Sequence, residues 1–135
     1  MNTEQIHDLV ERYYALFDSR TGDVSTLGSL VAPGWRNVGS PGAELDVDAF
    51  SGLLTGLTQI VPDLTWTISE TIIAGDRVIV RGEGSGTPVA QLFGAPATGR
   101  PFRIISIDIH TIADGRILSS VHLEDWAGAL AQINA

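Results

Sequence analysis

The chain contains no cysteine and no lysine among its 135 residues. Without cysteine it can form no disulfide and no thiolate zinc site, and it has no thiol nucleophile. Without lysine it cannot form the Schiff base that aldolase-type and pyridoxal phosphate chemistry require. All eight basic residues are arginines, against sixteen acidic residues, which gives a formal net charge of −8. This charge repels nucleic acid and anionic membrane surfaces, so we expect neither as a partner.

Long apolar runs are also missing. No stretch reaches the roughly 18 apolar residues of a membrane span, and the first fifteen residues lack the basic and then apolar pattern of a secretory signal. We therefore expect a cytoplasmic protein. Two cores of ordinary size would need roughly 200 residues or more, so we expect one domain over residues 1–135.

The first half of the sequence predicts three helices and a brief strand. Apolar residues recur at helical spacing, and Asn2 and Asp46 are placed to cap the first and third helices. Prolines follow the second and third helices, where they prevent continuation. The expected helices cover 3–18, 24–31 and 46–61, and the strand lies at 35–38.

From Leu64 onward the sequence becomes rich in threonine, valine and isoleucine. Two hairpins are predicted, with tight turns at Gly75-Asp76 and Asp114-Gly115. Helices followed by antiparallel strands are typical of an α+β fold in which helices pack on one face of a curved sheet. The strands cover 64–74, 76–87, 102–112 and 116–123, and residues 125–133 add a short terminal helix.

Short motifs follow one another along the chain in a specific order and spacing. They are APGWRN at 32–37, VPDL at 61–64, AGDRV at 74–78, GT at 86–87, FGAPATGR at 93–100, IHTIADGRI at 109–117 and LEDW at 123–126. With these motifs the chain resembles the SnoaL-like polyketide cyclase (ester cyclase) family of the nuclear-transport-factor-2-like superfamily, mainly over residues 60–133. The resemblance implies a cone-shaped, curved antiparallel sheet with three N-terminal helices on its concave face, a cystatin-like roll.

The resemblance also implies an activity. True cyclases of the family close a ring of a polyketide methyl ester by an intramolecular aldol reaction without a metal or organic cofactor, and their acid/base is an aspartate that falls on Asp125 here. An aspartate beside an apolar cavity has its charged form disfavoured, which raises its pKa and suits it to move a proton from carbon to oxygen. We therefore expect no cofactor, a small hydrophobic, polyketide-like ligand, and Asp125 as a catalytic residue.

The chain departs from the family close to this aspartate. The family's GTH reads Gly86-Thr87-Pro88, and Ser119, Ser120 and Val121 stand where the family commonly has a glutamate, a histidine and a tryptophan. Either the substrate differs or the chemistry has been lost. The nearby polar residues that could compensate are Asp108, His110 and His122, of which His110 is the second catalytic candidate.

The register of the last hairpin decides which of these residues meet. A two-residue turn sets His110 opposite residue 119 and places Asp125 on the face of His110. A three-residue loop with a bulge sets His110 opposite Leu118 and leaves Asp125 beside Arg103 and the isoleucines at 105, 107 and 109. Both are allowed. We favour the second, because it groups apolar with apolar residues and leaves Asp108, His110 and His122 together on the other face.

Each candidate also has a purely structural interpretation. Asp125 can cap the terminal helix, and strand histidines can hydrogen-bond at the surface or at a subunit interface. Aromatic residues at regular spacing are more often core than ligand contacts. No known ligand spacing supports a metal site. The residues expected to bind substrate are Tyr13, Phe17, Trp35, Asn37, Trp66, Phe93, Val121, His122 and Trp126.

Three functions remain open. The first is a cofactor-free enzyme that binds an apolar oxygenated ring compound and uses Asp125 for aldol-type cyclisation, isomerisation or a related proton transfer. The second is a module that binds a small hydrophobic molecule without chemistry. The third is epoxide hydrolysis with Asp108, Arg103 and Asp125, if the register brings them together. An exposed apolar strand face on such a sheet predicts a homodimer.

Overall fold

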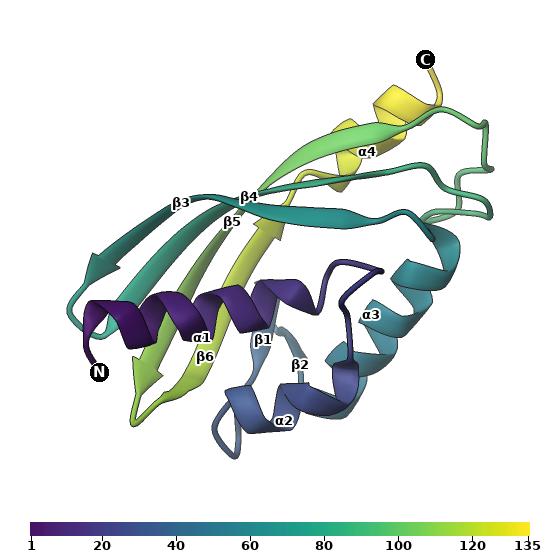
Figure 1. Ribbon diagram of the computed structural model, residues 1–135. Helices are drawn as coiled ribbons and strands as arrows, with labels where there is room; N and C mark the ends of the chain where they lie inside the picture. The colour runs from purple at the N-terminus through teal and green to yellow at the C-terminus, as the bar shows by residue number, and fades with distance from the viewer.

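The computed structural model describes residues 1–135. Four α-helices and a curved, unclosed sheet of six strands form the fold (Figure 1). The order across the sheet is β2-β1-β6-β5-β4-β3. The elements are α1 (Thr3–Ala15), the 3-10 helix η1 (Val24–Thr26), α2 (Leu27–Leu30), β1 (Asn37–Ser40), β2 (Ala43–Leu45), α3 (Val47–Ile60), β3 (Thr65–Ala74), β4 (Arg77–Gly86), β5 (Phe102–Ala113), β6 (Arg116–Glu124) and α4 (Trp126–Ile133).

The helices begin at the expected caps. The Asn2 side chain accepts the backbone N–H of Gln5, whose side chain accepts the N–H of Asn2 in return. Asp46 accepts the N–H of Ala49 and so caps α3. The first helix ends at Ala15, earlier than expected, because the next three residues bond back to carbonyls three positions earlier. The second expected helix is one turn of 3-10 helix followed by one α-helical turn.

The long strands form the two expected hairpins. In the second turn Asp114 and Gly115 both have positive φ, 53° and 79°, which a tight two-residue hairpin turn requires. The expected sheet was wholly antiparallel, and here the structure differs. The short hairpin β1–β2 joins the sheet through β1, which runs parallel to β6.

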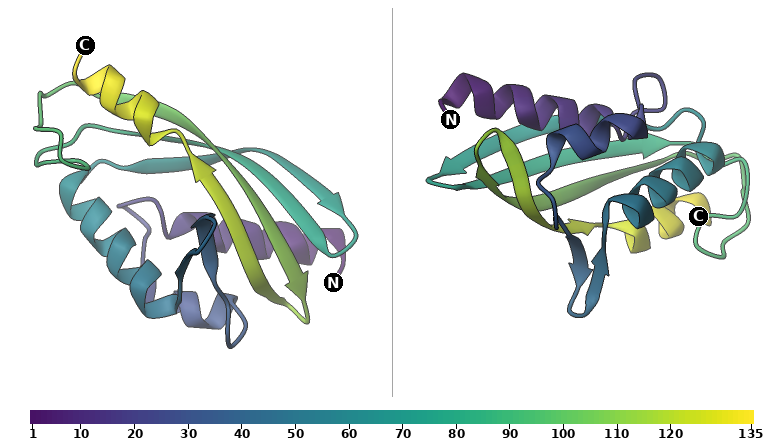
Figure 2. Two further views of the ribbon diagram at one scale, coloured as in Figure 1. Left: turned by 180° about the vertical axis from the view of Figure 1, so that it is seen from behind. Right: turned by 90° about the horizontal axis from the view of Figure 1, so that it is seen from below.

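The helices α1 and α3 lie on the same, concave side of the sheet, and α4 lies against β5 at the end far from the N-terminus (Figures 1 and 2). The apolar core fills the space between these helices and the sheet. None of the helices has the length and apolar character needed to cross a membrane. The fold thus presents two sheet faces, an inner one toward the helices and an outer one without them.

Glycines on the inner side of β4 make room for a tryptophan. A Cβ atom at Gly84 would lie 2.4 Å from the Trp66 ring, and one at Gly82 would lie 2.9 Å from its Nε1. Trp66 therefore lies against the strand, and its Nε1 donates to Ser106 Oγ at 3.1 Å. This packing brings an aromatic wall next to the polar residues of β5.

Candidate active site

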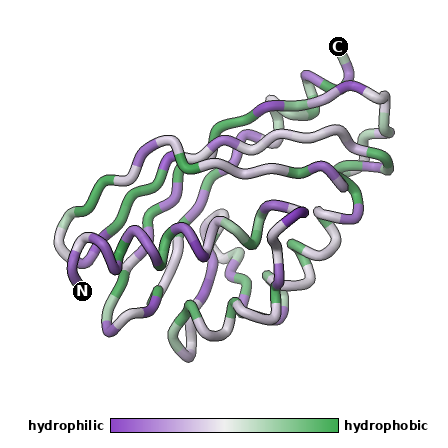
Figure 3. Tube along the Cα trace, viewed as in Figure 1, coloured by the Kyte–Doolittle hydropathy of each residue, from purple (hydrophilic) through white to green (hydrophobic).

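Between Ile105 and His110, strand β5 buries its polar residues and exposes its apolar ones. Ser106, Asp108 and His110 are at most 4% exposed, whereas Ile105 and Ile107 are 50% and 51% exposed. Figure 3 shows how polar and apolar residues alternate along the strands. Burying a carboxyl group costs free energy that burying an isoleucine would not. Stability alone would favour the opposite arrangement, so the interior points to a function.

Strand β6 places a second row of polar residues beside the first. Ser120, His122 and Glu124 lie opposite His110, Asp108 and Ser106, respectively. Ser120 is fully buried, and the side chains of His122 and Glu124 are 17% and 10% exposed. These two rows form what we call the inner polar cluster: Ser106, Asp108, His110, Ser120, His122 and Glu124.

The observed register matches neither expected one. The hairpin has the two-residue turn, but a bulge follows, in which Thr111 pairs with Ser119 and Leu118 is left out of the pairing. His110 therefore lies opposite Ser120, whereas the three-residue loop would set it opposite Leu118. The bulge adds one residue to β6, which restores the expected grouping: Asp108, His110 and His122 share one face, and the isoleucines of β5 lie on the other.

Asp125 lies outside the cluster. It is exposed and accepts the backbone N–H of Gly128 at 2.9 Å as the N-cap of α4. The expectation that this carboxyl group is sheltered in an apolar cavity is wrong, because Asp125 lies beside Ile105, on the outer face that the exposed isoleucines share. The alternative interpretation as a helix cap is confirmed. Val121 is 50% exposed on the outer face, so it does not line the interior as expected.

A chain of hydrogen bonds links the deepest polar groups. Tyr14 on α1 donates its hydroxyl hydrogen to Asp108 Oδ2, and its oxygen lies 2.8 Å from His110 Nε2. On the other side of the imidazole, Nδ1 lies 2.7 Å from Ser120 Oγ. Ser120 Oγ also accepts the indole N–H of Trp35 at 3.1 Å. This chain fixes the orientations of His110 and Asp108.

Burial shifts the pKa values of the titratable groups in the cluster. Desolvation raises the pKa of Asp108 to about 7, although the hydrogen bond from Tyr14 opposes the shift. Burial, and then the charge of Asp108, raises the pKa of Glu124 to about 8. Burial, and then His122, lowers the pKa of His110 to about 4, and burial also lowers the pKa of His122. Near neutral pH both histidines are therefore neutral, while both carboxyl groups titrate.

Two buried oxygen atoms near the cluster have no hydrogen-bond partner, Asp108 Oδ1 and Asn37 Oδ1. Buried acceptors in folded proteins are normally paired. The second polar atom of each side chain is paired, since Tyr14 donates to Asp108 Oδ2 and Asn37 Nδ2 donates to the Tyr13 hydroxyl at 3.3 Å. The carboxyl group of Asp108 is thus held at one oxygen and free at the other, as a general base requires.

Four aromatic residues expected to contact substrate belong to the core. Tyr13, Phe17, Trp35 and Trp66 are at most 6% exposed, and neighbouring rings in this group and Phe50 have centroids 5.3 to 6.5 Å apart. Such packing stabilises the core. It matches the structural interpretation of these residues, and their contact with a ligand stays a prediction.

Two partly exposed residues of the cluster and two aromatic residues that follow on from Glu124 form what we call the entrance: His122, Glu124, Trp126 and Phe93. Phe93 is 55% exposed, and its ring centroid lies 5.2 Å from that of half-buried Trp126. Trp126 in turn lies 6.3 Å from Trp66. These rings border the partly exposed histidine and glutamate.

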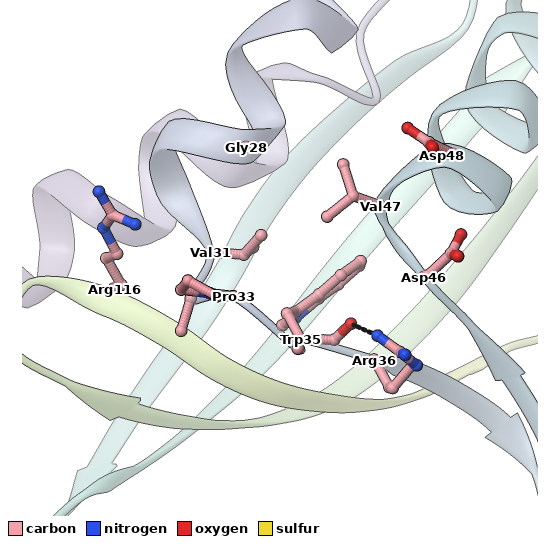
Figure 4. Close-up of a pocket in the computed structure, with 11 residues that line it drawn as sticks. Gly28, Val31, Pro33, Trp35, Arg36, Asp46, Val47, Asp48 and Arg116 are labelled. Atoms are coloured by element: carbon pink, nitrogen blue, oxygen red, sulfur yellow. Dashed lines mark hydrogen bonds between the residues drawn. The ribbon is translucent and has the colours of Figure 1, made fainter.

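Several hollows mark the surface. Asp108, His110, His122 and Glu124 line none of the five hollows of about 240 to 590 Å³. The hollow in Figure 4 lies between α2 and the start of α3, where Arg36, Asp46, Asp48 and Arg116 surround the edge of Trp35. Because Asp108 is only 4% exposed, a substrate can reach it only if neighbouring side chains move.

The residues proposed for epoxide hydrolysis do not meet. Arg103 points to the outer face, where it is exposed and pairs with Glu83 at 2.9 Å. Asp108 lies inside the fold, and Asp125 lies on the surface. That hypothesis is wrong, because the alternation along β5 separates residue 103 from residue 108. No group of three or more histidine and acidic side chains is arranged to hold a metal ion.

The list of sequence candidates omitted two residues of the site, Tyr14 and Glu124. Tyr14 follows Tyr13 on α1, and helical spacing alone cannot tell which of two adjacent tyrosines reaches the sheet. Glu124 shares the period of two with Ser120 and His122, and this period was the signal that could have found it.

The structure is similar to solved structures along its whole length. TsrD from Streptomyces laurentii is 27% identical, with a TM-score of 0.87, over 100% of this chain and 98% of that one. IdmH from Streptomyces antibioticus is 29% identical, with a TM-score of 0.82, over 96% and 98% of the two chains. A protein of ketosteroid isomerase-like fold from Catenulispora acidiphila is 20% identical, with a TM-score of 0.77, over 93% and 92%. That last likeness concerns the fold alone.

No curated protein matches the sequence. A family model does: the model of the SnoaL-like polyketide cyclases matches residues 7–133, which include most of α1, all of α3 and every residue of the inner polar cluster. The chain therefore belongs to the SnoaL-like polyketide cyclase family.

Proposed function

We propose that the protein is an acid–base catalyst that moves a proton between carbon and oxygen in an apolar, oxygenated ring compound of polyketide type. The reaction is an aldol-type cyclisation, an isomerisation or a related proton transfer, and it calls on no metal or organic cofactor. The observation that carries the proposal is the free Oδ1 atom of Asp108, buried in the interior while Tyr14 holds Oδ2. Membership of the cyclase family supports the same class of chemistry.

The two inward carboxyl groups divide the work. A base must be ionised and an acid must be protonated. Burial raises the pKa of both carboxyl groups, and the charge of Asp108 raises the pKa of Glu124 further, so ionised Asp108 favours protonated Glu124. Asp108 Oδ1 takes the proton from carbon, and Glu124 gives a proton to the substrate oxygen.

His122 lies beside the proposed acid. Its Nε2 atom is 3.6 Å from Glu124 Oε1, and the neutral imidazole can orient the carboxyl group without adding charge. Both residues lie at the entrance, where a substrate meets them before it reaches Asp108. The apolar walls of Phe50, Trp66 and Trp126 fit the ring of such a substrate.

The test compares three isosteric variants on a panel of polyketide methyl esters. Asp108→Asn removes the proposed base, and we expect it to lower kcat/KM by about 10²- to 10⁴-fold, the usual contribution of acid–base catalysis. Glu124→Gln should have a loss of similar size. Asp125→Asn keeps the helix cap and serves as the matched control, with turnover like that of the wild type. Full turnover in Asp108→Asn would exclude this aspartate as the base.

One observation favours a second function, the binding of a small hydrophobic molecule without chemistry. Pro88, Ser119 and Val121 stand where the resemblance gives a histidine, a glutamate and a tryptophan as usual in the family. A ligand identified by mass spectrometry after purification, unchanged by the protein and bound equally well by Asp108→Asn, would support this second function and contradict the first.

We also propose that two copies associate through what we call the outer apolar face: Ile72, Ile105, Ile107, Ile109, Val121 and Leu123. These six side chains are 41% to 67% exposed and lie on β3, β5 and β6, and Ile79 of β4 lies between Ile72 and Ile109. An apolar patch of this extent on a water-exposed sheet favours self-association, since pairing two copies removes both patches from water.

A further inference from the structure

We infer that Trp35, Ser120, His110 and Tyr14 form a hydrogen-bond relay with one fixed direction, which holds Asp108 at Oδ2 and keeps Oδ1 free for the substrate. This inference rests on the proposed function, because it explains how the proposed base, Asp108, is held in place. The four residues are positioning residues, since none of them needs to touch the substrate. The residues of the relay come from α1, β5, β6 and the loop before β1. Their four side chains and that of Asp108 are at most 4% exposed.

The direction follows from the first member. An indole N–H can only donate, so Ser120 Oγ accepts from Trp35. The hydroxyl hydrogen of Ser120 is then available for His110 Nδ1, 2.7 Å away, and in this direction Nδ1 carries no hydrogen. A neutral imidazole has its single hydrogen on the other nitrogen. His110 Nε2 therefore donates to the Tyr14 oxygen, and Tyr14 donates to Asp108 Oδ2.

The reverse direction leaves the ionised Asp108 carboxylate without a donor. If His110 Nδ1 carried the hydrogen, it would donate to Ser120 Oγ, and the Ser120 hydrogen would turn to the Tyr13 hydroxyl. Nε2 would then take the Tyr14 hydrogen, and Asp108 would lose its one side-chain donor. Each unpaired buried polar group is costly, so the forward direction is the stable one.

The relay controls the base through the last bond. The hydrogen bond from Tyr14 stabilises the ionised form of Asp108 and opposes the effect of burial. It also assigns the two oxygens different roles, since one is occupied and the other is free. The other titratable groups that face this region are Tyr13 from α1 and His122 and Glu124 from β6.

The direct test is the tautomer of His110, read from the ¹⁵N chemical shifts of its two ring nitrogens at a pH well above the pKa of about 7 of Asp108, where that group is ionised. The relay requires a single tautomer with hydrogen on Nε2 and none on Nδ1. The opposite tautomer in the wild-type protein would overturn the inference, whether or not the protein turns over any substrate. This measurement needs no variant and no ligand, so its failure is distinguishable from a failure of the proposed function.

A matched pair of serine variants tests the coupling to Asp108. Ser120→Ala breaks the relay, so His110 populates both tautomers and Tyr14 donates less to Asp108. We therefore expect the Asp108 carboxyl group to titrate at higher pH in ¹³C spectra. Ser106→Ala is the control, because Ser106 is equally buried and accepts the Trp66 indole N–H at the same 3.1 Å but contacts no histidine. Equal titration of Asp108 in both variants would overturn the coupling. Ser120→Thr, which keeps the hydroxyl group, should retain the wild-type titration.

Discussion

Glu124 and Asp125 are adjacent acids at the end of β6 that lie in opposite environments. The Glu124 side chain is 10% exposed and feels the charge of Asp108, whereas Asp125 is exposed and caps α4. The difference comes from the alternation of side chains along a strand, which sends neighbours to opposite faces. Two acids that look interchangeable in the sequence should therefore behave differently in every measurement that depends on burial.

We expect the thermal stability to fall as the pH rises from 6.5 to 8. An unfolded aspartate or glutamate, with a pKa near 3.8 or 4.5, is already ionised in this range, whereas folded Asp108 and Glu124 keep their protons up to about pH 7 and 8. The folded state thus binds more protons, and raising the pH favours unfolding by up to about 1.4 kcal/mol per pH unit for each group. The pKa values of the buried histidines are lowered from 6.5, so these residues affect the pH dependence of stability mainly at lower pH.

Calorimetry across this range checks the prediction. Glu124→Gln cannot ionise, so its melting temperature should fall less steeply than that of the wild type. Asp125→Asn should follow the wild-type curve. A variant at Glu124 with the full wild-type slope would show that this carboxyl group is ionised in the folded protein at neutral pH.

Removal of the cap at Asp125 should lower stability without touching the cluster. Asp125→Ala loses the bond to the Gly128 N–H, and we expect it to reduce the free energy of unfolding by about 1 kcal/mol. Asp125→Asn retains an acceptor and should be close to the wild type. Urea denaturation measures both, and equal stability of the alanine and asparagine variants would argue against a capping role.

A methyl group added at Gly84 should disturb the aromatic wall. Its Cβ would lie 2.4 Å from Trp66, closer than atoms can approach, so the ring must move away from Ser106. We expect a loss of about 1 to 3 kcal/mol in unfolding free energy. Gly56→Ala in α3 is the control, because nothing lies within 4 Å of its Cβ and alanine favours helix, so this variant should gain about 0.5 to 1 kcal/mol.

Much of the fold could be predicted from local signals in the sequence. The caps at Asn2 and Asp46 and the turns at Gly75 and Gly115 fixed the elements to within a few residues, because each signal acts on its immediate neighbours. The pairing of β1 with β6 could not be predicted in this way, because it joins segments about 80 residues apart along the chain.

The site was predictable only in part. The favoured register grouped Asp108, His110 and His122 on one face of the hairpin and Asp125 with the isoleucines on the other, and the bulge at Leu118 keeps this grouping. The expectation that failed is that the face of Asp125 is the sheltered one. The period of two in Ser106, Asp108 and His110 was visible in the sequence, but only the packing of α1 showed that this polar side is the buried one.

The outer apolar face should make the protein a dimer in solution, and a single charge should separate the copies. We expect sedimentation of the wild type at micromolar concentration to give about twice the mass of the chain. Ile107→Glu places a carboxylate in the middle of the patch, next to Leu123, and should yield a folded monomer, because burying an unpaired charge between two copies costs several kcal/mol. Val89→Glu is the matched control, since Val89 is 63% exposed in the loop before β5, away from this face. A monomeric wild type would contradict association through this face. Equal dissociation of the Ile107→Glu and Val89→Glu variants would contradict it as well.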